Sequence, residues 1–139
     1  EEIKNICTLM ADRFENTELG KRALSSKWHK AEYEFRCRIT LKNGTSRIIK
    51  GTIDLVFENK DGTYTVVDYK TNQEIKPEIY RDQLACYRRA VSQMMNVSPE
   101  KVSCSLYYLR FDREVDITAE ASKADLAEAI ENMEKQEEQ

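Results

Sequence analysis

The stretch Gly51-Thr-Ile-Asp-Leu-Val-Phe-Glu-Asn-Lys-Asp-Gly-Thr-Tyr-Thr-Val-Val-Asp-Tyr-Lys70 decides the fold of this 139-residue chain. Two runs rich in β-branched and aromatic residues flank the turn sequence Asn59-Lys-Asp-Gly62, so the stretch predicts a β-hairpin. Asp54 and Asp68 each lie seven residues from the centre of the turn, which predicts that they face each other across the two strands. Lys70 follows Asp68 by two residues and therefore should point to the same face.

Two carboxylates opposed on an otherwise apolar hairpin repel each other, and burial increases the cost. A divalent cation between Asp54 and Asp68 would relieve the repulsion, and hard oxygen ligands favour Mg²⁺ or Mn²⁺. The backbone carbonyl of Tyr69 lies between the two carboxylates in sequence and can supply a third oxygen. The alternative is a buried ion pair, in which Lys70 neutralises one aspartate. One lysine cannot neutralise both, however.

Periodicity predicts the elements around this hairpin. Apolar residues at helical spacing predict a helix over 1–16, in a region that Gly20 ends. Alternating polarity predicts a strand over 31–41, and Asn43-Gly44 then turns the chain into a second strand over 46–57. Further patterns predict strands at 64–70, 102–111 and 115–117, and helices at 77–95 and 120–136. This order predicts an α/β or α+β domain with helices packed on a mixed sheet.

Length and composition fit one globular domain over residues 1–139, closed by an acidic C-terminal helix at 120–139. No run of about 18 apolar residues occurs, so no membrane span is predicted. The chain opens without a signal peptide or an initiator methionine, and we expect it to be a fragment of a larger protein. Its four cysteines are irregularly spaced without a C-x-x-C pair, which argues against zinc or iron–sulfur ligation and favours reduced core thiols.

Charge is unevenly distributed along the chain. The net charge is -3, but residues 20–50 carry nine Lys and Arg against two acids, whereas residues 112–139 carry ten acids against three bases. Such asymmetry can create a basic face toward phosphates. The alternative is a pair of ordinary solvated surfaces.

The motifs resemble those of a known nuclease family. G-x-I-D-L at 51–55, V-V-D-Y-K-T at 66–71 and Y-x-x-Q-L-x-x-Y at 80–87 resemble the RecB-like branch of the PD-(D/E)xK nucleases. The segments 14–22, 32–35 and 106–109 extend the resemblance to the nuclease domains of AddA-type helicase–nucleases. It covers roughly residues 10–118, and D…DYK combined with Q-x-x-x-Y is its most specific part.

The resemblance implies a restriction-endonuclease-like αβββαβ core, in agreement with the order of elements above. It implies that Asp54 and Asp68 bind Mg²⁺ or Mn²⁺ together with the carbonyl of Tyr69. It further implies that Lys70 orients or activates the attacking water and offsets charge on the phosphate. Glu32 would be the supporting acid of the first strand, although Glu34, on the same face, could take that place, and both could equally be surface residues.

Gln83 and Tyr87 lie one helical turn apart and, by the same resemblance, would line the edge that faces DNA. Tyr87 also belongs to an apolar helical stripe, so core packing is an equally good interpretation of this residue.

The implied activity is that of a Mg²⁺- or Mn²⁺-dependent deoxyribonuclease, specifically an exonuclease. The implied setting is a helicase–nuclease of double-strand-break repair and recombination in the bacterial cytoplasm, at the nucleoid. Its partners would be DNA, a helicase motor and a second helicase–nuclease subunit. The chain contains no G-x-x-x-x-G-K-[ST] motif, so the motor would lie elsewhere. The alternatives are a catalytically silent DNA-binding module of the same fold and a stand-alone repair or restriction nuclease.

One feature departs from the family pattern. RecB-like nucleases carry a metal-ligating histidine on a helix before the core, whereas the single histidine here, His29, lies beside Trp28 just before the first core strand. We interpret His29 as a surface or packing residue and expect the family histidine upstream of Glu1. A chain without it is expected to bind metal weakly and to cleave slowly.

Overall fold

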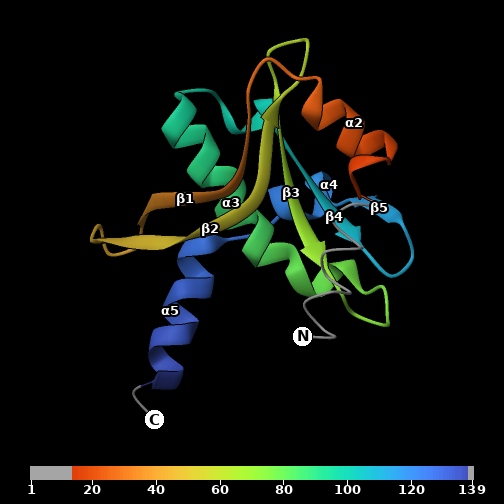
Figure 1. Ribbon diagram of the computed structural model, residues 1–139. Helices are drawn as coiled ribbons and strands as arrows, with labels where there is room; N and C mark the ends of the chain where they lie inside the picture. Colours follow the sequence, from red (N-terminus) through yellow and green to blue (C-terminus); the bar gives the residue numbers. More distant parts are fainter. Residues whose placement is uncertain (1–13, 138–139) are drawn as a thin grey trace.

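The computed structural model describes residues 14–137, in which helices cover both faces of a five-stranded sheet (Figure 1). In chain order the elements are α2 (Glu18–Leu24), β1 (His29–Thr40), β2 (Ser46–Glu58), β3 (Tyr64–Lys70), a 3-10 turn (Pro77–Tyr80), α3 (Arg81–Met95), a second 3-10 turn (Pro99–Lys101), β4 (Val102–Tyr108), β5 (Arg113–Asp116), α4 (Thr118–Ser122) and α5 (Leu126–Glu137). The predicted fold class, a mixed sheet with flanking helices, is confirmed.

The strands lie in the order β1-β2-β3-β4-β5. Neighbouring strands are antiparallel except β3 and β4, which are parallel and are connected through α3. A parallel pair needs a long crossover, and the 15-residue helix α3 provides it. The carboxyl ends of β3 and β4 therefore lie at the same edge of the sheet, near the N-terminus of α3.

Some predicted boundaries differ from the observed ones. The predicted helix over 1–16 lies mostly outside the described residues, and of its last positions Phe14 and Glu15 are helical. Gly20 lies inside α2 and does not end a helical region. The closing helix predicted at 120–136 is two helices, because the side chain of Asp125 accepts a hydrogen bond from the Glu128 backbone and caps a new helix, α5.

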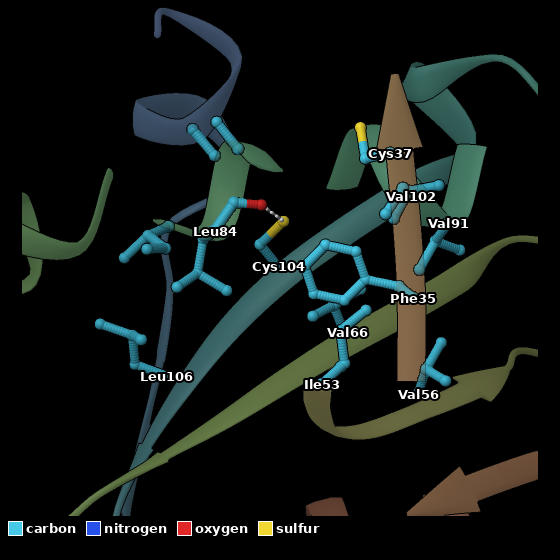
Figure 2. Packing of buried hydrophobic residues seen from close by; sticks show 14 of the residues in the cluster. Phe35, Cys37, Ile53, Val56, Val66, Leu84, Val91, Val102, Cys104 and Leu106 are labelled. Atoms are coloured by element: carbon cyan, nitrogen blue, oxygen red, sulfur yellow. Dashed lines mark hydrogen bonds between the residues drawn. The ribbon is translucent and has the colours of Figure 1, made fainter. Parts of the chain in front are cut away.

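Two apolar layers form, one on each face of the sheet. The larger layer lies between the sheet and α3, and Figure 2 shows Phe35, Val66 and Leu84 meeting within it. Cys104 also lies there, and its thiol contacts the backbone carbonyl of Leu84 at 3.6 Å. The smaller layer, under α2, packs Phe14 against Tyr107 and their neighbours. Within residues 14–137, no helix is both long enough and apolar enough to cross a bilayer.

β1 and β2 bend together partway along their length (Figure 1). Glu32 has a positive φ of 50°, which is unfavourable for a residue with a side chain. On one side of it, Ala31 pairs with Leu55 and lines the hollow beneath α2; on the other, Tyr33 pairs with Ile53 and packs toward α3. The hairpin therefore exchanges its two faces at Glu32, and residues 33–53 project beyond it as what we call the β1–β2 arm.

Gly20 allows α2 to approach the preceding turn. A Cβ atom at this position would lie 2.0 Å from the backbone carbonyl oxygen of Phe14, which cannot rotate away. That oxygen also accepts hydrogen bonds from the backbone and hydroxyl of Thr17, the N-cap of α2. We expect Gly20→Ala to lower the free energy of unfolding by about 2 kcal/mol, because the clash outweighs alanine's helix propensity.

Urea unfolding followed by circular dichroism measures this effect. The matched control is Lys21→Ala, the same product residue at the next, exposed position of α2. A Gly20→Ala variant as stable as Lys21→Ala would contradict the prediction.

Candidate functional site

The two aspartates of the hairpin meet at the end of the β2–β3 ladder. Leu55 pairs with Val67 and Val56 with Val66, and this register brings Asp54 opposite Asp68. Asp68 is buried and Asp54 is half-buried. The backbone N–H of Tyr69 donates a 2.8 Å hydrogen bond to Oδ2 of Asp54, so the backbone that follows Asp68 orients the facing carboxylate.

Lys70 extends from the same face of β3 and its ammonium has three contacts. Nζ lies 2.5 Å from Oδ2 of Asp68, donates a 3.0 Å hydrogen bond to Oε1 of Gln83, and lies 3.9 Å from the centre of the Tyr80 ring. A carboxylate, an amide oxygen and an aromatic face all attract a cation. Together they hold the ammonium beside the carboxylates.

The carboxylates are only partly neutralised. Burial, with a contribution from the negative charge of Asp54, raises the pKa of Asp68 to about 6, although Lys70 acts in the opposite direction. Oδ2 of Asp68 is buried and accepts no well-aligned hydrogen bond within residues 14–137, although the Lys70 ammonium is in ionic contact with it. The ion pair predicted as the alternative to a metal site therefore exists, yet it leaves the second carboxylate uncompensated.

Gln83 and Tyr87 continue the network along α3. The side-chain amide of Gln83 accepts from Lys70 and donates a 3.0 Å hydrogen bond to the Tyr87 hydroxyl. The Tyr87 ring packs edge-on against Phe35 in the core, at 5.3 Å between ring centres. Burial and the charge of Asp68 raise the pKa of the Tyr87 phenol. The core packing considered for Tyr87 from the sequence is therefore observed, and its hydroxyl contacts Gln83.

The first strand contributes less direct contact. The pairs on either side of Glu32 place it across from Asp54, at the strained position where the hairpin changes face, and its side chain is exposed. Glu34 is also exposed but lies further along the arm, opposite Thr52. His29 is exposed at the start of β1 and lines the hollow beneath α2, away from the carboxylates.

The donor groups fit a hard divalent cation with several of its own waters. Two carboxylates converge on a single ammonium, so the pair keeps a net negative charge that a further cation would stabilise. Mg²⁺ is often held by one or two carboxylates while it keeps water ligands. No group of three or more His, Cys, Asp or Glu side chains suited to a metal occurs within the described part of the chain.

Tyr80 is a site residue that sequence reasoning missed. Its ring lies against the Lys70 ammonium, and its hydroxyl donates a 3.0 Å hydrogen bond to Oδ1 of Asn72. Tyr80, Gln83 and Tyr87 are spaced three and four residues apart, which is the spacing of one helical face. That spacing was a signal in the sequence, but it cannot show that the face is directed at a lysine on a neighbouring strand.

The family model described as the PD-(D/E)XK nuclease superfamily matches residues 1–139. The chain belongs to this superfamily. Within it, this nuclease-superfamily chain is similar to the AddA-type ATP-dependent helicase/nuclease proteins of several bacteria. It is 30% identical over 118 residues to the protein from Lysinibacillus sphaericus (strain C3-41), and the aligned segment covers 76% of this chain and 9% of the relative. It is 32% identical over 117 residues to the protein from Acetivibrio thermocellus, covering 72% and 9%.

A third relative, from Thermoanaerobacter sp. (strain X514), has the same name and is 30% identical over 129 residues, covering 81% of the chain and 10% of the relative. The PD-(D/E)XK chain thus spans about a tenth of the length of the curated relatives it matches. The predicted family and its AddA-type relatives are confirmed. The resemblance concerns the nuclease-like module alone.

Proposed function

We propose that this chain is a Mg²⁺- or Mn²⁺-dependent DNA nuclease domain whose centre is Asp54, Asp68 and Lys70. The observation that carries the proposal is the pairing of two carboxylates on one face with a single ammonium 2.5 Å from Asp68. A divalent cation held by both aspartates and the Tyr69 carbonyl would polarise a phosphate oxygen and make a water molecule more acidic.

The remaining groups would position the attacking water and stabilise the charge that develops on the phosphate. The Lys70 ammonium lies beside the carboxylates, where it can orient the attacking water and offset the charge that develops on the phosphate. Gln83 and Tyr80 fix that ammonium, and Tyr87 fixes Gln83 through its hydroxyl. In this scheme Gln83 and Tyr87 support the site from α3 and border the DNA. Glu32, across from Asp54, would act as the supporting acid.

The names of the relatives suggest a setting for this chemistry. In a protein like the ATP-dependent helicase/nucleases, the domain would degrade DNA as an exonuclease beside a helicase motor, and its partner would be a second helicase–nuclease subunit. We propose double-strand-break repair and recombination as its role. The substrate, chromosomal DNA, implies work at the nucleoid in the bacterial cytoplasm.

A second candidate is a catalytically silent DNA-binding module of the same fold. The observation in its favour is that residues 14–137 bring only two acidic side chains, and no group of three metal-ligating ones, to a common site. Such a module would bind DNA without hydrolysing it. The two candidates differ in one measurable property, cleavage in the presence of a divalent cation.

The test combines metal binding with cleavage. With the chain in excess over end-labelled linear DNA, we expect cleavage in Mg²⁺ or Mn²⁺ and none in EDTA. Asp54→Asn should weaken Mn²⁺ binding, measured by calorimetry, at least tenfold and should slow cleavage accordingly, because one of two carboxylate ligands becomes a neutral amide.

The matched control is Glu128→Gln, which removes one exposed carboxylate from α5. It should leave both Mn²⁺ affinity and cleavage unchanged. DNA binding without cleavage in either metal would favour the silent module. Unchanged Mn²⁺ binding in Asp54→Asn would reject the proposed ligand.

A further inference from the structure

The β1–β2 arm carries cations that directly oppose each other. Arg36 on β1 pairs with Lys50 on β2, and Arg38 pairs with Ile48 one step further along the arm. Residues two apart on a strand share a face, so the three cations form one row. Like charges directly opposite in an antiparallel ladder destabilise it. A row of this kind therefore costs stability unless an anion lies on it.

Internal partners do not neutralise this row. Among residues 14–137, neither Arg36, Arg38 nor Lys50 forms an ion pair, and all three side chains are exposed. Within the described strands β1 and β2, the acid on this face beside them is Glu34, two residues before Arg36. The row therefore retains a net positive charge of about two, by simple count of formal charges.

The opposite face of the arm behaves differently. Arg47 points to α5 and forms two hydrogen bonds with Glu134, of 2.8 and 3.2 Å. Glu131 of α5 accepts a 3.1 Å hydrogen bond from the backbone of Lys42. The acidic C-terminal helix thus compensates one face of the basic segment and leaves the other face with its charges unpaired.

The unpaired cations border two adjoining hollows. One, of about 490 Å³, is lined by Arg36, Arg38 and Lys50 together with Cys37, Ile48 and Gln93. The other, of about 660 Å³, shares Arg36 and Lys50 with it. A hydrogen bond with Cys86 lowers the pKa of the Cys37 thiol, and the positive charge of Arg89 on α3 acts in the same direction. Arg89 is therefore a fourth cation near the arm, on the side where Cys37 packs toward α3.

We propose that this face of the β1–β2 arm binds the phosphate backbone of DNA. Lys50 lies four residues from Asp54 along β2, about 13 Å at the usual rise of a strand. That distance equals the axial rise of about four base pairs of a DNA duplex. The choice of DNA as the polyanion rests on the proposed nuclease function. The evidence that the row binds some polyanion is independent of that function.

The test is DNA binding without cleavage. Fluorescence anisotropy in EDTA, with labelled single-stranded and duplex oligonucleotides, should show that Arg36→Gln/Arg38→Gln/Lys50→Gln binds at least tenfold more weakly. The slope of log affinity against log salt should fall by about two to three, because each lost phosphate contact accounts for about 0.7 to 0.9. Removal of the repulsion between Arg36 and Lys50 should leave the melting temperature equal or higher.

The matched control is Lys21→Gln/Lys60→Gln/Lys135→Gln, which makes the same change in net charge at exposed positions outside the arm. It should keep most of the affinity and the salt slope. An arm variant that binds like this control would overturn the proposal and would assign the row to an acidic protein surface instead. A wild-type chain that binds no DNA at low salt would also overturn it. A chain that binds through the arm without cleaving would refute only the nuclease function.

Discussion

Lys70→Met is expected to slow DNA cleavage by 10²- to 10³-fold while Mn²⁺ binds at least as tightly as to the unchanged chain. The ammonium is held 2.5 Å from Asp68 and 3.0 Å from Gln83, and an electrostatic group fixed beside developing charge contributes on this order. The same ammonium competes with a metal ion for the carboxylates. Its removal should therefore separate the two roles, since catalysis falls and metal affinity does not.

Single-turnover cleavage and calorimetric Mn²⁺ titration measure the two quantities on the same samples. Lys60→Met serves as the control, because Lys60 lies exposed in the turn between β2 and β3. Lys70→Arg should restore less than a tenth of the lost rate, since a planar guanidinium does not fit the contacts of a compact ammonium. Cleavage by Lys70→Met within threefold of wild type would remove Lys70 from the mechanism. Weaker Mn²⁺ binding would assign it a structural role instead.

The hairpin that carries the site could be predicted from local sequence. Runs of β-branched and aromatic residues on both sides of the Asn59–Gly62 turn predict the register, and the observed strand Tyr64–Lys70 has the predicted bounds. The fold class also followed, because the order of helices and strands restricts the possible layers. In each of these cases the information lies within a few residues along the chain.

Other features depend on contacts distant in sequence. The positive φ of Glu32 is set by the bend shared with β2, and its side chain gives no local sign of it. The cation–π contact between Tyr80 and Lys70 requires the crossover that carries α3 back over the sheet. The helical position of Gly20 reflects its close approach to Phe14, whereas a glycine in sequence indicates a helix end. Tertiary packing overrides the local pattern at each of these residues.

The bend at Glu32 and the buried charge at Asp68 have a common consequence. Both are unfavourable for folding, and both adjoin Asp54, which lies across from Glu32 on β1 and from Asp68 on β3. Unfavourable local conformations and buried charges concentrate at functional sites, where the surrounding structure maintains them. A substitution that removes the charge should therefore increase stability as it removes activity.

Asp68→Asn tests this directly through the pH dependence of unfolding. The pKa of Asp68 is raised from 3.8 to about 6, so the folded chain holds a proton that the unfolded chain has already lost. A group whose pKa is higher in the folded chain than in the unfolded chain stabilises the fold fully below pH 3.8, and this stabilisation is lost as pH rises through 6. Two pKa units correspond to about 3 kcal/mol. As pH rises from about 4 to about 7, the free energy of unfolding of Asp68→Asn should therefore become about 2 to 3 kcal/mol larger than that of wild type. Above about pH 7 the difference should stay constant.

Urea unfolding in EDTA across this pH range measures the gain, and Asp61→Asn is the control with the opposite expected sign. Hydrogen bonds from Thr63 lower the pKa of Asp61, so its charged form stabilises the fold. The free energy of unfolding of Asp61→Asn should therefore fall below that of wild type as pH rises. Mn²⁺ at neutral pH should then raise the melting temperature of wild type and not of Asp68→Asn, because a ligand stabilises only the state that binds it. If Asp68→Asn were the less stable protein at neutral pH without metal, the carboxylate would be a structural group held by Lys70, and the excess negative charge that calls for a cation at this hairpin would not exist.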